Sequence, residues 1–174
     1  MIRKRKMFSR PKKLYQKTRI EEENKLLKIY GLKNKREVWK ALAKINYYRT
    51  RAMALAKAPE SEQAVFLGKL SALGFKAGTI SDVLALQVED ILKRRLPTIV
   101  AGKQLAYTVQ QARQMVVHKK IKINGKIVNI PGYIVSLAEE GNITSSQKLV
   151  PRKSAEEESS DSSDSSEESS EDTE

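Results

Sequence analysis

The sequence predicts an α+β protein with an amino-terminal helical domain, a small domain in which helices precede a β-hairpin, and a disordered acidic tail. Three observations support this prediction. Helical periodicity with start and stop signals runs to about residue 92, the period changes to two after Lys120, and residues 151–174 contain no large apolar side chain. We therefore divide the chain into four parts: residues 1–17, 18–92, 93–150 and 151–174.

Residues 1–17 form a basic arm. Too few of its residues are apolar to build a core, so we expect the arm to be disordered in isolation. Phe8 and Tyr15 lie between the cations and could stack on nucleic acid bases, which favours a binding role over that of a solubilising tail.

The next part begins with two helices. Thr18 and Glu21 have the spacing of a helix start, and Gly31 is a stop signal. Asn34 and Glu37 repeat the start signal, which predicts a second helix immediately after the first.

The second helix is long and ends before Pro59. Its aromatic residues Trp39, Tyr47 and Tyr48 could stack on RNA, but we favour packing for them. The positions expected in the core are Val38, Leu42, Ile45 and Leu55, and those expected at the surface are Lys35, Arg36, Lys40, Lys44, Arg49 and Arg51. A third helix is marked by Ala64, Leu67, Leu70 and Leu73 and closed by Gly74.

A further helix is expected from Val83 to Leu96, entered at Ser81-Asp82. Pro97 interrupts it, because proline lacks a backbone N–H and its ring clashes with the carbonyl of Lys93. We expect a kink or a break between Leu96 and Thr98.

A short helix follows Thr108, which stands three residues before Gln111 as in a capping box. Ala112, Met115 and Val116 make an apolar stripe at helical spacing. The residues left for other faces are Gln110, Arg113, Gln114 and Lys119.

A hairpin turns at Asn124-Gly125, because both residue types tolerate positive φ. This turn sets Ile123 opposite Lys126 and Ile121 opposite Val128. The face away from the apolar side carries Lys120, Lys122, Ile127 and Asn129. We expect residues 121–123, 127–129 and 133–135 to form a small antiparallel sheet.

The charge of the chain is split. The net charge is +12, but residues 1–150 carry 31 basic and 11 acidic residues, a net of +20, whereas the tail holds ten acidic residues. So cationic a body indicates a polyanionic partner, and nucleic acid is the first candidate. No segment is typical of a membrane span, a signal peptide or a lipidation site, so we expect no membrane association.

Catalytic signals are weak. There is no cysteine, and the only histidine, His118, has no cysteine partner, so we expect no metal site and no cofactor. Glu21-Glu22-Glu23 suits the first turn of a helix, and Glu139-Glu140 a surface loop. No glycine-rich phosphate loop is present.

Several motifs together resemble the small-subunit ribosomal protein four family in its archaeal and eukaryotic form. They run in order from about Tyr15 to Val135. They are Arg19-Ile-Glu-Glu-Glu23, Lys28-x-Tyr30-Gly31-Leu32, Asn34-Lys-Arg-Glu-Val-Trp39, Arg94-Arg95-Leu96, Ala112-Arg113-Gln114, His118, Ile123-Asn124-Gly125-Lys126, Val128 and Pro131-x-Tyr133-x-Val135.

The resemblance implies an alpha-L-like RNA-binding domain and a structural protein of the cytoplasmic small ribosomal subunit. It implies binding to the five-prime domain of small-subunit rRNA near the path by which mRNA enters, contacts with neighbouring ribosomal proteins, and roles in assembly and translation accuracy. We expect neither a homo-oligomer nor an enzyme.

From this resemblance and from charge we expect an extended set of RNA-binding residues. They are Arg3, Lys4, Arg5, Lys6, Arg10, Lys12, Lys13, Arg19, Lys35, Arg36, Arg49, Arg51, Arg94, Arg95, Lys103, Thr108, Gln111, Arg113, Gln114, His118, Lys119, Lys122, Asn124, Lys126 and Tyr133.

Two alternatives stay open. An RNA-modifying enzyme of the pseudouridine synthase type can carry the same RNA-binding domain, but it needs a separate catalytic domain with an essential aspartate. Only Asp82 and Asp90 lie outside the tail, and no remaining segment is long enough. A free regulatory RNA-binding protein would share the same surface.

Overall fold

The computed structural model describes residues 7–146. It is mostly helical with one small antiparallel sheet, which confirms the α+β class. Two predictions concern residues outside this range. They are the RNA contacts of Arg3, Lys4, Arg5 and Lys6, and the disorder of the acidic tail.

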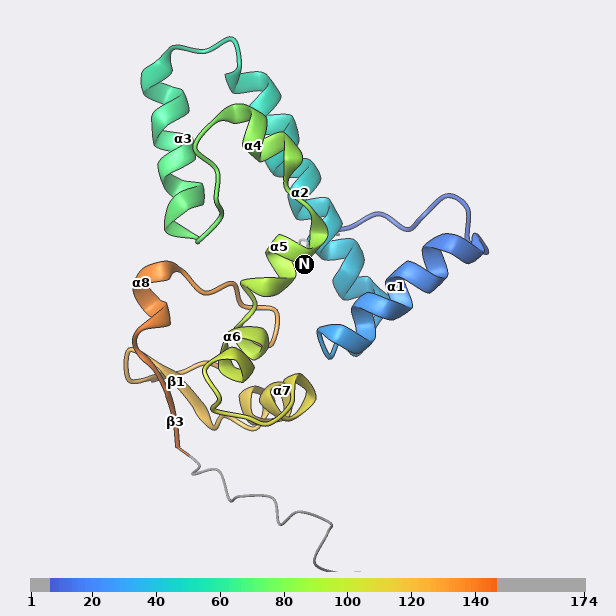
Figure 1. Ribbon diagram of the computed structural model, residues 1–174, viewed down its shortest axis with the longest axis vertical. Helices are drawn as coiled ribbons and strands as arrows, with labels where there is room; N and C mark the ends of the chain where they lie inside the picture. Colours follow the sequence, from blue (N-terminus) through green and yellow to red (C-terminus); the bar gives the residue numbers. More distant parts are fainter. Residues whose placement is uncertain (1–6, 147–174) are drawn as a thin grey trace, which may run out of the picture.

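Helix α2, Lys35–Leu55, is the spine of the molecule (Figure 1). Contacts with it are made by α1 (Lys17–Ile29), α4 (Ile80–Ala85) and α5 (Val88–Lys93). Helix α3 (Glu60–Ala72) returns beside the far half of α2. The remaining helices, α6 (Leu96–Gly102), α7 (Val109–Val117) and α8 (Leu137–Glu140), form a second layer with the sheet.

The helix starts differ in part from those expected. Helix α2 begins after Asn34, as predicted, but the Asn34 side chain makes no capping bond. Helix α1 begins at Lys17, so Thr18 lies inside it and the predicted cap at Thr18 is wrong. For the same reason Glu21 lies beyond the first turn, and the dipole explanation of the acidic run does not hold.

The ends of α1 and α3 confirm the predicted glycine stops. Gly31 and Gly74 have φ of +56° and +84°. The Phe75 N–H donates to the Leu70 carbonyl (3.1 Å) and the Leu32 N–H to the Leu27 carbonyl (3.0 Å), which satisfies carbonyls that would otherwise lack partners.

Val38 and Ile45 lie in the core of the helical region, as predicted, and Leu55 is partly buried. Leu42 is 44% exposed, so its placement in the core was wrong. The tyrosines of α2 differ in burial. Tyr48 is buried, whereas Tyr47 is 59% exposed because it faces away from the core stripe.

The helix expected from Val83 to Leu96 is two helices. Thr79, not Ser81, caps α4: its hydroxyl accepts from the Asp82 N–H, and the Asp82 carboxylate accepts from the Thr79 N–H. The chain is extended at Leu86, and α5 starts one residue after Gln87, whose N–H donates to Asp90 (2.9 Å). The local caps end one helix and start the next.

Pro97 lies in the first turn of α6. The predicted break between Leu96 and Thr98 is therefore wrong, because α6 runs through these residues. The interruption comes earlier, at Arg94-Arg95. Proline suits its position because the first-turn N–H groups of a helix have no intrahelical acceptor.

The sheet has the order β2-β1-β3, with β1 at Ile121–Ile123, β2 at Lys126–Ile127 and β3 at Ile143–Ser145. The hairpin register is confirmed: Ile123 pairs with Lys126, and the Val128 N–H reaches the Ile121 carbonyl. The third strand was predicted wrongly as residues 133–135.

Residues 133–135 instead pair with the segment that precedes α6. The Leu96 N–H donates to the Tyr133 carbonyl (2.9 Å), and the Val135 N–H donates to the Arg94 carbonyl (3.0 Å). The edge of β1 that does not face β2 therefore pairs with β3. Glu139 and Glu140 lie in α8, not in a loop, and Ser136 caps that helix by accepting from the Glu139 N–H.

The buried apolar residues form two clusters. One lies among α1–α5 and is centred on Ile45, Leu70, Val83 and Leu92. The other lies between α6, α7 and the sheet and is centred on Leu96, Val100, Val116 and Ile121. Among the described residues, no helix is long and apolar enough to cross a membrane.

Candidate nucleic-acid interface

The end of α7 and the hairpin place their cations on the outside of the second cluster. Ala112, Met115 and Val116 hold α7 against this cluster, as predicted from the apolar stripe. Gln114 and His118 are therefore exposed. A hollow of about 200 Å³ beside them is lined also by Lys120.

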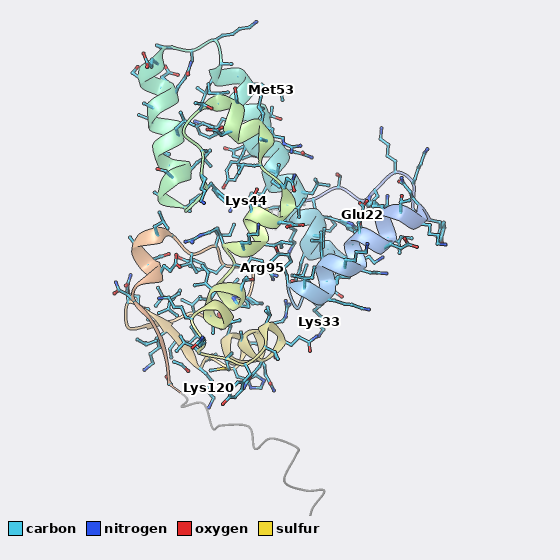
Figure 2. All side chains as sticks on the ribbon, viewed as in Figure 1. Glu22, Lys33, Lys44, Met53, Arg95 and Lys120 are labelled. Carbon is cyan, nitrogen blue, oxygen red and sulfur yellow. The ribbon has the colours of Figure 1, made fainter. Side chains whose placement is uncertain are left out.

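The turn after α7 orients the next two lysines. Lys119 has φ +60°, although it is not glycine, and its N–H donates to the Val116 carbonyl. The Lys120 N–H donates to the Met115 carbonyl (2.9 Å) and completes a Schellman turn. Both side chains are exposed, and Lys120 lies at the end of the molecule farthest from Met53 (Figure 2).

The hairpin extends this basic region. Asn124 and Gly125 have φ of +50° and +76°, which confirms positive φ at both turn positions. Ile121 and Ile123 are buried on one face of β1, so Lys122 between them points to the other face. Lys126 is exposed on β2. We name Lys119, Lys120, Lys122 and Lys126 the hairpin lysines.

A cluster around Glu37 joins the two apolar clusters. The Glu37 carboxylate on α2 accepts from both terminal nitrogens of Arg113 on α7, at 2.6 and 2.9 Å, and from Arg95 Nη2 at 2.7 Å. Arg95 is 4% exposed and lies at the start of α6 (Figure 2). Burial raises the pKa of Glu37, but hydrogen bonds and charge from the two arginines outweigh it, so this pKa lies below its usual value.

Arg94 makes a second junction. Its guanidinium donates to Glu140 on α8 (2.8 Å) and to the Val135 carbonyl (2.9 Å). A Cβ added to Gly74 would lie 2.7 Å from the Arg94 guanidinium, so the end of α3 approaches it closely. Lys103 donates to the Glu140 carbonyl.

Several expected RNA-binding residues are thus engaged within the protein. Arg19 and Lys35 reach the buried Glu23 at 3.4 and 3.7 Å. Arg49 donates to the Leu86 carbonyl (2.7 Å), and the Arg51 guanidinium lies 5.8 Å from the Phe66 ring centre. These contacts give the cations a structural role that the sequence alone did not indicate.

The polar residues of the set have local roles. The Thr108 hydroxyl accepts from the Gln111 N–H (3.2 Å), which confirms that Thr108 starts α7. The Gln111 side chain accepts from the Tyr107 N–H. The Tyr133 hydroxyl donates to Glu139 at 2.7 Å, a bond that raises the pKa of Tyr133 and lowers that of Glu139.

Apart from Arg51 and Thr108, the exposed members of the expected set fall on two surfaces. Gln114, His118, Lys119, Asn124 and Lys126 lie around the end of α7 and the hairpin, and Arg10, Lys12, Lys13 and Arg36 lie on the arm and the start of α2. The sequence interpretation missed Glu23, Glu37 and Glu140 as anchors of arginines. In the sequence only Glu37 stands alone among cations, whereas Glu23 and Glu140 end short acidic runs, and neither pattern identifies the arginine that each one binds.

Comparison with known proteins agrees with this architecture. Residues 94–140 match the family model described as "S4 domain", which spans α6, α7, the hairpin and α8. "Small ribosomal subunit protein uS4" of Picrophilus torridus is 42% identical over 152 residues, covering 82% of this chain and 83% of the relative.

Two further archaeal relatives carry the same name. That of Saccharolobus islandicus is 43% identical over 165 residues, covering 88% of this chain and 91% of the relative. That of Methanocella arvoryzae is 40% identical over 149 residues, covering 78% and 73%. Matches of this identity extend well beyond the S4 domain into the helical region, and the chain belongs to the small ribosomal subunit protein uS4 family.

Proposed function

We propose that this protein is a structural component of the cytoplasmic small ribosomal subunit, and that it binds small-subunit rRNA through the end of α7 and the hairpin. The observation that carries the proposal is that the four hairpin lysines, none of them buried, lie within the short stretch from the end of α7 to the hairpin of the matched S4 domain. Family membership supports the ribosomal setting, because the relatives are named as proteins of this subunit.

The mechanism combines charge neutralisation with shape. Lysines that contact phosphates release condensed counterions, which drives binding without reading sequence. The deep groove of an RNA duplex admits side chains poorly, so a rigid helix and hairpin select RNA by the shape of its folded backbone. His118 and Asn124 add hydrogen-bonding groups at the same surface.

Arg94, Arg95 and Arg113 act indirectly in this proposal. Their guanidinium groups bind Glu140 and Glu37, so they position α6 and α7 rather than meet phosphates. The two separate apolar clusters support a helical domain at residues 18–92 and an RNA-binding domain at 93–150. We further propose the five-prime domain of the rRNA as the binding region and assembly of the subunit as the role.

The salt dependence of rRNA binding tests the proposal. Replacing Lys122 and Lys126 by alanine removes up to two phosphate contacts, so binding weakens and the slope of log affinity against log salt falls by about 1 for each contact. The matched control replaces Lys69 and Lys76, exposed lysines of the helical region. That control keeps the slope.

An unchanged slope in a folded Lys122/Lys126 variant would reject the hairpin as the rRNA surface. A free regulatory RNA-binding protein would show the same salt dependence. Stable association with the small ribosomal subunit distinguishes a ribosomal component from such a regulator. A catalytic role finds no support in the relatives, which are named as ribosomal proteins.

A further inference from the structure

The outward face of α2 carries no fully buried residue, although Trp39 packs in part against the first apolar cluster. At helical spacing it presents Arg36, Trp39, Lys40, Ala43, Lys44 and Tyr47. The opposite face holds the buried stripe of Val38, Ala41, Ile45, Tyr48 and Ala52. One face of the helix therefore builds the core, and the other alternates cations with aromatic rings.

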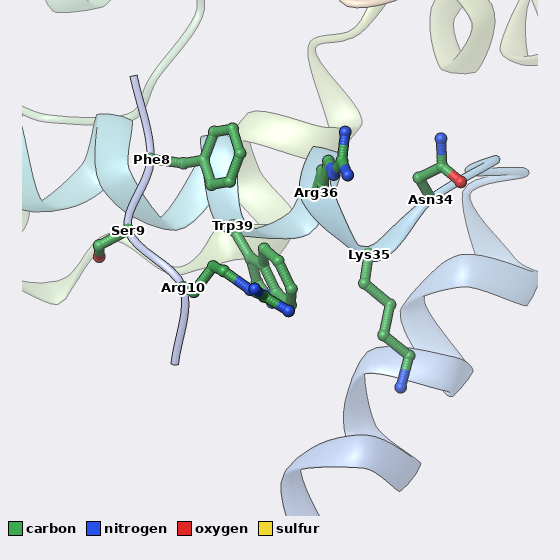
Figure 3. A pocket seen from close by; sticks show the side chains of 7 residues that line it. All are labelled: Phe8, Ser9, Arg10, Asn34, Lys35, Arg36 and Trp39. Carbon is green, nitrogen blue, oxygen red and sulfur yellow. The ribbon is translucent and has the colours of Figure 1, made fainter. Parts of the chain in front are cut away.

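The arm crosses this outward face. The rings of Phe8 and Trp39 lie 6.1 Å apart between centres, at 37°. Phe8 lines two hollows on either side of it. One, of about 880 Å³, is lined also by Arg10, Arg36 and Trp39 (Figure 3). The other, of about 710 Å³, is lined also by Tyr47.

The aromatic rings at these hollows are held in place. The Trp39 Nε1–H donates to the buried Glu23 (2.9 Å), which fixes the orientation of the indole. Tyr47 is 59% exposed and packs against Tyr48, with 5.8 Å between ring centres. Trp39 and Tyr47 are eight positions apart on α2, which corresponds to about 12 Å along the axis.

The charge at the hollows is of one sign. Arg10, Arg36 and Lys40 are exposed, and no carboxylate lines either hollow among the described residues. Lys35 extends toward α1, where it meets Glu23 (Figure 3). Lys44 lies 5.9 Å from the Tyr48 ring centre, and burial lowers its pKa.

We infer that this face of α2, together with arm residues 7–10, binds unpaired RNA nucleotides: bases stack on Trp39 and Tyr47, and phosphates meet Arg10, Arg36 and Lys40. Aromatic faces interleaved with cations are the arrangement that binds single strands, because every base has a π face and every linkage a charge. This inference rests on the proposed ribosomal function, but it concerns a separate surface and a different form of RNA.

Trp39 is the only tryptophan of the chain, so its fluorescence reports on this site alone. The experiment titrates the full-length protein with single-stranded hexauridylate and hexaadenylate at moderate salt. We expect saturable quenching, because a stacked base perturbs the indole directly. A linear hexaphosphate has charge but no bases, so it should cause no saturable quenching of Trp39 fluorescence.

Two variants locate the effect. Tyr47→Leu and Lys40→Gln alter exposed side chains and should keep the fold, as circular dichroism will verify. Loss of one stacking platform should weaken hexanucleotide binding about tenfold. Tyr107→Leu and Lys69→Gln are the matched controls, since Tyr107 and Lys69 are exposed and line neither hollow, and the affinity of these variants should equal that of the unaltered protein.

Equal quenching by hexaphosphate, or hexanucleotide affinity unchanged in Tyr47→Leu and Lys40→Gln, would overturn the inference. So would an absence of quenching by RNA combined with a change of Trp39 emission on adding purified small-subunit proteins, which would assign the face to a protein partner. The Lys122/Lys126 variant should still bind the hexanucleotide. If the unaltered chain binds the hexanucleotide but not rRNA, the proposed function fails and this site stands.

Discussion

Glu37 neutralises two arginines that come from different elements of the carboxyl-terminal layer. Its carboxylate is 22% exposed, and the Arg95 side chain is only 5% exposed. Such a pair is costly to break, because removal of one partner leaves a charge in a site that water reaches poorly. The ion cluster therefore fixes how α6 and α7 sit on α2.

Glu37→Gln should lower the free energy of unfolding by about 3 kcal/mol, since Arg95 loses its counter-charge. Urea denaturation at pH 7 measures this loss. Glu22→Gln removes the same charge from an exposed position of α1 and should cost less than about 0.5 kcal/mol. Similar losses in both variants would mean that the cluster contributes no more than surface charge.

The same cluster gives a pH dependence. The folded pKa of Glu37 lies below its unfolded value, near the ordinary 4.5, so its contribution is complete above that value and is lost as the pH falls through the folded pKa. The stability difference between the unaltered protein and Glu37→Gln should therefore shrink below about pH 4.5. A difference that stays constant down to pH 3 would contradict the assignment.

Lys119 combines backbone strain with an exposed charge. A non-glycine residue at φ +60° costs about 1 kcal/mol. Lys119→Gly should therefore raise the free energy of unfolding by about 0.5–1 kcal/mol while weakening rRNA binding. Lys119→Ala is the control: it should weaken binding equally without the gain in stability. Unimpaired binding by both variants would exclude Lys119 from the interface.

At the scale of the elements, the hairpin depends on its turn. Gly125 has φ +76°, and a Cβ added there would meet open space, so any cost of substitution comes from the backbone alone. Gly125→Val should lower the free energy of unfolding by about 1–3 kcal/mol and misalign the hairpin lysines. Gly132→Val also enters open space, but without positive φ. Thermal denaturation should show a much smaller loss there, and equal losses would reject the turn as the cause.

The elements that follow local rules could be predicted from the sequence. The stops at Gly31 and Gly74, the start of α7 at Thr108 and the hairpin register each depend on residues a few positions apart. The break at Leu86-Gln87 was missed because apolar residues on both sides continue one helical pattern, while two sets of caps divide it.

The pairings between distant segments could not be predicted. Residues 133–135, Tyr-Ile-Val, suit a strand better by composition than Ile-Thr-Ser of β3, yet β3 pairs with β1 and residues 133–135 bond to the segment before α6. Likewise, Glu37 and Arg113 are 76 positions apart, so charge alone could not show that Arg113 binds a carboxylate. Residue type was enough to predict which cations are candidates for the interface. Only the structure shows which of them are exposed and which are bound to other groups of the protein.

At the scale of the whole molecule, the charge asymmetry suggests screening by the tail. Residues 1–150 carry a net +20, and the ten acidic residues of the tail oppose it. A chain that ends at Val150 should bind random RNA more tightly, with a smaller gain for cognate rRNA. Added salt should close the gap as the Debye length shortens. Binding measurements on both RNAs at low and high salt test this, and equal effects on the two would leave the tail without a screening role.

The central claim is that this protein is a resident component of the small ribosomal subunit. The most direct measurement is sedimentation of ribosomal subunits washed at high salt, followed by quantification of this protein against other subunit proteins. We expect one copy for each small subunit, retained through the wash because the protein binds folded rRNA. Its loss from washed particles, with recovery in the soluble fraction, would contradict the account and indicate a free RNA-binding regulator.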